Sequence, residues 1–147
     1  MRNVVNMAVA AVLIVLAVVA GKIIGKIREP KKSEIPPAED ILSKAVAEAN
    51  KELPMMIDAA TRLDRASTNG NVLRYHYTLL QRPAPGETLE QLQAGVPALA
   101  EAARKKVCAD GSLRPLLGIG IAMTYTYVTT TGAQAFEFTV WPQDCFR

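Results

Sequence analysis

The chain has 147 residues, 50% of them hydrophobic, and a formal net charge of +3 at pH 7. This length corresponds to one domain that can bury a core of its own. The positive excess lies ahead of Pro36, where six basic residues stand against two acidic ones, while the remainder has 11 basic and 12 acidic residues. A nearly neutral domain lacks the basic surface that nucleic acids require, so we expect no nucleic-acid partner.

The N-terminal segment is the most apolar part of the chain. Residues 4–24 read VVNMAVAAVLIVLAVVAGKII, and a helix of this length rises about 30 Å, which matches the hydrocarbon thickness of a bilayer. We therefore predict a single-pass transmembrane anchor over residues 1–27. A cleaved signal peptide, and so a secreted domain, is the alternative, but apolar character continues past Gly21. Gly21 and Gly25 also form a weak helix-pairing signal for a homodimer.

A polar linker separates this anchor from the domain. Residues 28–37, REPKKSEIPP, combine charge with three prolines and show no apolar periodicity. The domain is predicted over residues 38–147. The Lys and Arg cluster after the apolar segment places this domain in the cytoplasm by the positive-inside rule.

Two cysteines indicate the opposite side of the membrane. A disulfide between Cys108 and Cys145 would fasten the C-terminal tail to the core and would persist only in an oxidising compartment. Closing that loop would stabilise the fold by about 4 kcal/mol in the chain-entropy model. Two buried, unpaired thiols are the alternative. We favour the disulfide and an outward-facing domain.

The first half of the domain predicts a helix and a hairpin. Apolar residues recur at helical spacing over residues 41–53, and Pro54 ends that helix. Asn69-Gly70 tolerates the positive φ angles of a tight turn, so we expect a β-hairpin centred there. Residues 73–79 then alternate apolar and polar side chains, which is typical of a strand with one buried face.

The second half repeats this order. Thr88 with Gln91 three residues on forms a capping-box pattern ahead of a helical stretch over residues 89–107. Pro97 predicts a kink or two abutting helices, because it cannot donate to the helical ladder. LRPLL at residues 113–117 is expected to form a short helix.

Two further strands complete the predicted fold. Residues 119–127 and 136–140 alternate apolar and polar side chains on either side of a TTTGA turn. The order is therefore helix, two strands, helix, two strands. We predict an α+β fold, a two-layer α-ββ-α-ββ domain in which the helices cover one face of an antiparallel sheet.

The sequence contains no motif of a known enzyme class. No Gly-rich phosphate loop, HExxH or GxSxG is present, and the single histidine, His76, has no second His or Cys at metal-ligand spacing. We therefore predict a non-enzymatic protein without cofactor or metal. The alternative is a membrane-bound thiol or hydrolytic enzyme that uses Cys108 or His76.

Four charged residues cluster ahead of the first predicted hairpin: Asp58, Arg62, Asp64 and Arg65. They are a candidate recognition patch. The alternative, which we favour, is a set of ion pairs that fixes the helix to the sheet edge, because charges of alternating sign usually satisfy one another.

Several short motifs recur together between Glu52 and Cys145. They are ELPMMID followed by TRLD, then YHYTL, a late Cys, a G-x-x-x-x-Y-x-Y strand and a terminal Asp-Cys. This pattern resembles a loose group of small bacterial envelope proteins with an N-terminal apolar segment and no assigned activity. The resemblance implies a structural Cys108–Cys145 disulfide and a domain outside the cytoplasm. Ala59-Ala60 departs from the charged residues of that group, which weakens the recognition patch.

These inferences together predict a binding or assembly module of the bacterial envelope. The chain would be held in the inner membrane, with a periplasmic domain that contacts another protein through a sheet edge or its polar face. Its expected partners are the lipid bilayer and one protein.

Overall fold

The computed structural model describes residues 38–146. The predicted anchor at residues 1–27, with its Gly21/Gly25 pair, and the linker at residues 28–37 lie outside them. Between residues 38 and 146, no helix has the length and apolar character needed to cross a bilayer. The elements run in the order α2 (Ala38–Ala49), the 3-10 helix η1 (Asn50–Glu52), β1 (Met55–Asp58), β2 (Thr61–Asn69), β3 (Val72–Leu79), α3 (Leu89–Ala94), α4 (Val96–Ala109), α5 (Arg114–Gly118), β4 (Ala122–Thr129), β5 (Gln134–Val140) and α6 (Pro142–Cys145).

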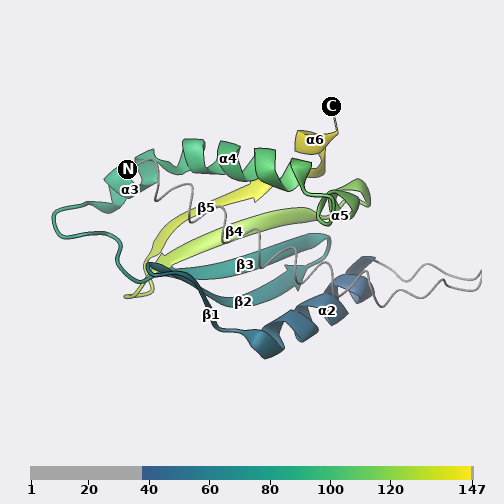
Figure 1. The fold of residues 1–147 in the computed structure, drawn as a ribbon, viewed down its shortest axis with the longest axis horizontal. Coiled ribbons are helices and arrows are strands. Elements are labelled where there is room, and N and C mark those ends of the chain that lie inside the picture. The colour runs from purple at the N-terminus through teal and green to yellow at the C-terminus, as the bar shows by residue number, and fades with distance from the viewer. Residues whose placement is uncertain (1–37, 147) are drawn as a thin grey trace, which may run out of the picture.

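The five strands form one sheet in the order β1-β2-β3-β4-β5 (Figure 1). Neighbouring strands are antiparallel except β3 and β4, which are parallel. The predicted α+β class is confirmed, but the prediction of an all-antiparallel sheet is wrong. Helices α3, α4 and α5 connect the C-terminal end of β3 to the start of β4, which lies beside the N-terminal end of β3. Such a crossover makes β3 and β4 parallel.

The prediction of two strands before the second helix also missed β1. This strand pairs with β2 through Met55↔Leu63 and Met56↔Arg62 around a turn at Ala59 and Ala60. The Asp58 carboxylate accepts a hydrogen bond from the Ala60 backbone N–H at 2.7 Å, an Asx-type contact that holds the turn. A strand of four residues is too short to show a clear alternation in the sequence.

The local signals of the sequence agree better with the structure. Thr88 and Gln91 form the expected capping box, with the Gln91 N–H donating to Thr88 Oγ1 at 3.2 Å. Gly95 separates two abutting helices, and Pro97 lies in the first turn of the second. The β2–β3 turn is Gly70-Asn71, one residue later than predicted, and Gly70 has a positive φ of 56°.

The helices pack on the apolar face of the sheet. In Figure 1, α2 runs beside β2, and α4 runs beside β5. Two aromatic stacks cross the central strands, Tyr75–Tyr125–Phe138 and Tyr77–Tyr127–Phe136, with centroid separations of 4.4–5.8 Å. The surrounding core takes residues from both layers: Leu42, Leu63, Leu73, Val107, Leu113, Leu117, Ile121, Met123 and Val140.

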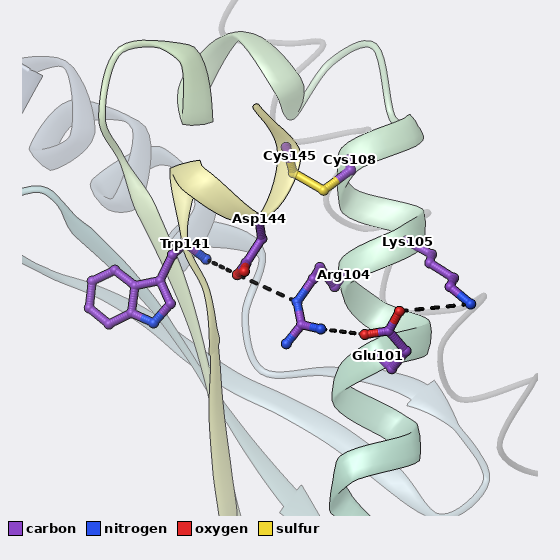
Figure 2. Close-up of polar contacts among 7 residues, drawn as sticks. All are labelled: Glu101, Arg104, Lys105, Cys108, Trp141, Asp144 and Cys145. Atoms are coloured by element: carbon purple, nitrogen blue, oxygen red, sulfur yellow. Dashed lines mark hydrogen bonds and ion pairs between the residues drawn. A yellow bond between two sulfur atoms is a disulfide. The ribbon is translucent and has the colours of Figure 1, made fainter. Parts of the chain in front are cut away.

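A disulfide and an ion pair fasten α6 to α4 (Figure 2). Cys108 and Cys145 are bonded, with their Cα atoms 5.1 Å apart. Asp144 accepts a hydrogen bond from the Trp141 N–H at 2.8 Å, and Arg104 Nε lies 3.5 Å from the same carboxylate. The C-terminal segment is therefore held at two points along α4.

Candidate functional site

The second face of the sheet is polar, and we call it the polar face. Side chains on a strand alternate between faces, so the residues between the core tyrosines point away from the helices. Each α-helix of residues 38–146 contributes to the apolar core, and none packs on this side. The polar face is built from Arg62, Asp64, Arg65 and Ser67 of β2, Arg74, His76 and Thr78 of β3, Thr124 and Thr126 of β4, and Glu137 and Thr139 of β5.

A β-bulge puts two neighbouring charges on this face. Leu63 pairs with Tyr77 and Arg65 pairs with His76, so Asp64 is the extra residue of β2. Without a bulge, strict alternation would turn Arg65 toward the core. With the bulge, Asp64 and Arg65 both reach the polar face.

Asp64 is the centre of the first polar cluster. Its carboxylate accepts hydrogen bonds from Arg62 Nε and from Thr78 Oγ1, each at 2.5 Å. These contacts link β2 to β3 and leave Arg62 with a satisfied charge. Arg65, the exposed neighbour, has no carboxylate at ion-pair distance among the described residues.

His76 is the centre of the second cluster. Its Nε2 lies 2.8 Å from Ser67 Oγ. Partial burial lowers the pKa of His76 from its ordinary value of 6.5, and the guanidinium groups of Arg65 and Arg74 lower it further, while two nearby carboxylates partly oppose the shift. The ring is therefore neutral at pH 7, flanked by two cations.

Cross-strand contacts extend this cluster to the β5 edge. Thr126 donates to Glu137 Oε2 at 2.6 Å, and Thr124 and Thr139 share a hydrogen bond of 2.9 Å. Arg74 Nη2 lies 4.0 Å from Glu137, a contact at the limit of an ion pair. With His76 neutral, the polar face holds three arginines against two carboxylates and has a small positive charge.

The structure divides the predicted recognition patch. Arg62, Asp64 and Arg65 lie on the polar face, whereas Asp58 holds the β1–β2 turn. Arg62 and Asp64 form an ion pair, as the favoured interpretation expects, but the pair lies within the sheet and does not join a helix to it. The edge is held instead by Asn50, whose side chain bonds to the backbone of β2.

Sequence reasoning missed Ser67 of β2, Arg74 of β3 and Glu137 of β5 as site residues. Ser67, Arg74 and Glu137 occupy polar positions of their strands, which is a visible signal. Their convergence on His76 depends on the strand order, because β3 and β4 are neighbours only through the crossover.

The alternative of a thiol or hydrolytic site is not supported by this arrangement. Cys108 is in a disulfide and α4 packs on the apolar face, while His76 lies across the sheet on the polar face. In the part of the chain that the structure describes, no three His, Cys, Asp or Glu residues form a group that could hold a metal.

A cavity of about 500 Å³ lies away from the polar face, between the loop at residues 80–87 and the β4–β5 turn. Three of its lining side chains already have partners: Arg82 pairs with Glu87, and Thr129 Oγ1 lies 2.8 Å from Thr131 Oγ1. The polar face, where Arg65 has no carboxylate partner in the described part of the chain, is the better candidate site.

The fold has known counterparts, although no protein-family model and no curated protein matches the chain. One solved structure is a predicted secreted protein from Pseudomonas aeruginosa, 19% identical, with a TM-score of 0.63 over 74% of this chain and 92% of that one. A pilotin of the Vibrio vulnificus type 2 secretion system, EpsS, is 16% identical, with a TM-score of 0.56 over 74% and 91%. The type II secretion system pilotin AspS from Vibrio cholerae is 18% identical, with a TM-score of 0.53 over 74% and 92%. At these identities the similarity to the three structures is one of fold.

Proposed function

We propose that this chain is an envelope protein whose domain binds a protein partner through the polar face. The observation that carries the proposal is a sheet face of polar and charged residues on which no described helix packs. The shared fold with two pilotins of secretion systems supports a role in assembly rather than in catalysis. The disulfide supports a location outside the cytoplasm.

The chemistry of the polar face favours a partner with an acidic segment. No carboxylate among residues 38–146 lies at ion-pair distance from Arg65, and Arg74 is only loosely paired to Glu137. Arginine binds carboxylates in bidentate geometry and is frequent at the energetic centres of interfaces. A partner carboxylate between Arg65 and Arg74 would replace the missing counter-charge beside a neutral His76.

We also propose that the chain is anchored in the inner membrane and is related to small envelope proteins. The apolar segment at residues 4–24 supports an anchor in the inner membrane, and a tethered domain gains effective concentration for a partner in the same envelope. The motifs between Glu52 and Cys145 support kinship with the small envelope proteins that the sequence resembles.

Site-specific photocrosslinking tests the partner. A photoreactive amino acid replaces Thr126 on the polar face or, as the matched control, the exposed Lys105 on α4. Irradiation of intact cells should give one recurrent crosslinked protein from position 126, and that product should be missing from position 105. Equal products from both positions, or crosslinks to the same chain alone, would refute binding through the polar face.

A charge reversal then tests the chemistry. Arg65→Glu should abolish the crosslink formed from a reporter at Thr126, because the partner's acidic segment is repelled. Lys105→Glu makes the same change of charge on the helical side and should leave the crosslink intact.

A further inference from the structure

Several elements converge at one end of the sheet, which we call the proximal end. The Ala122 N–H at the start of β4 donates to Asn71 O in the β2–β3 turn at 2.9 Å. Val140 at the end of β5 pairs with Met123. Glu39 Oε1 in the first turn of α2 approaches Gly70. Figure 1 shows the first turn of α2, α5 and α6 together at this end.

The proximal end also carries most of the exposed apolar surface. Of the four large apolar side chains that are exposed among the described residues, three lie here: Ile119 is 55% exposed, Trp141 47% and Phe146 46%. Phe146 lies against Gly118, and the Arg114 guanidinium is 5.2 Å from its ring centroid. The opposite end is formed by the polar loop at residues 80–87 and the threonine-rich β4–β5 turn.

The chain ahead of α2 reaches the domain at this same end. If residues 1–27 span the bilayer, the linker at residues 28–37 extends at most about 31 Å in a polyproline-like conformation. The proximal end is therefore the part of the domain that the linker brings nearest to the lipid. Tryptophan, other apolar side chains and a long arginine are the residues that suit a membrane–water interface.

We propose that the proximal end rests on the bilayer surface, with Ile119, Trp141 and Phe146 in contact with phospholipid and Arg114 at the headgroups. This inference rests on the anchor in the proposed function. It sets the strands upright on the membrane, because their ends meet at the surface. The polar face then stands free above the lipid, where a partner can reach Arg65 and His76.

Trp141 is the single tryptophan of the chain, so its fluorescence reports this contact directly. The full chain is reconstituted in phosphatidylcholine vesicles, with and without lipids brominated on the acyl chains near the headgroup. Brominated lipid should quench the fluorescence of Trp141 in the vesicles. Aqueous iodide should quench Trp141 less in the vesicles than in the unfolded chain in 8 M urea without detergent, where the residue is exposed.

A matched variant moves the reporter to the opposite end of the sheet. Trp141→Phe combined with Thr130→Trp places one tryptophan in the exposed β4–β5 turn. It should be quenched by iodide and spared by brominated lipid. Ile119→Ser changes an exposed side chain at the proximal end and should weaken the quenching of Trp141 by brominated lipid.

The possible results separate this inference from the protein-binding proposal. Equal quenching of both reporters by brominated lipid, or no quenching of Trp141, would overturn the proximal contact while leaving the crosslink from position 126 untouched. Failure of the chain to enter vesicles would overturn it as well, because the anchor would be absent. Loss of the crosslink with Trp141 quenching retained would refute the partner and keep the membrane contact.

Discussion

Asn50 is expected to be a main determinant of how α2 is attached to the sheet. Its side-chain Nδ2 donates to Ala66 O at 2.9 Å, and its Oδ1 accepts from the Ala66 N–H at 2.8 Å. β1 pairs with β2 only as far as Leu63, so Ala66 lies where the outer edge of β2 has no neighbouring strand. The Asn50 amide replaces that strand for one residue.

The cost of removing this amide follows from the burial of its partner. Asn50→Ala leaves the backbone N–H and C=O of Ala66, a residue only 4% exposed, without their bonds. Each unsatisfied buried group costs about 1–3 kcal/mol. Because Asn50 is itself exposed, water can partly replace the amide, and we expect a total loss of about 2 kcal/mol, the low end of that range for two groups.

Urea unfolding measured by far-UV circular dichroism, in one detergent for all variants, tests this value. A loss of about 2 kcal/mol should lower the urea midpoint by about 1–2 M. Lys51→Ala is the matched control, since Lys51 forms a surface ion pair with Glu48 and should change stability by less than about 0.5 kcal/mol. Equal midpoints for Asn50→Ala and Lys51→Ala would refute the role of Asn50.

Three further predictions concern the disulfide, the histidine and the C-terminal helix. Replacing Cys108 and Cys145 by Ser should cost about 4 kcal/mol in the same assay, because the bond closes a separation of 37 residues; a smaller loss than for Asn50→Ala would contradict the chain-entropy argument. The pKa of His76 is lowered in the fold, so the unfolded chain binds the proton first and stability should fall as pH drops below 6.5. Arg65→Ala should raise that pKa, measured by NMR on the single imidazole, and an unchanged value would show that Arg65 does not contribute to the shift. Asp144→Ala should destabilise the fold by about 1 kcal/mol and speed hydrogen exchange of the Trp141 N–H; unchanged exchange would argue against this cap.

The sequence was a good guide to local structure. The capping box at Thr88, the helix boundary at Pro97 and the alternation of the tyrosine strands all depend on neighbours within a few residues, and each has a distinct pattern. The parallel β3–β4 pair depends on where a crossover of three helices returns the chain. That return is fixed by packing against the whole sheet, so no local pattern encodes it.

In the candidate site, too, the sequence predicts some residue positions locally and leaves others to the pairing of whole strands. Alternation identifies His76 as a residue of the polar side of its strand, but it assigns Arg65 to the wrong side, because the bulge at Asp64 shifts the phase of β2 by one residue. The shift exposes a cation next to an imidazole that is already beside Arg74. Among residues 38–146, Arg65 has no carboxylate at ion-pair distance and Arg74 has only a 4.0 Å contact with Glu137, so an external carboxylate would stabilise both cations. The bulge therefore links the fold to the proposed function: it adds Arg65 to a sheet face whose other charges are largely paired.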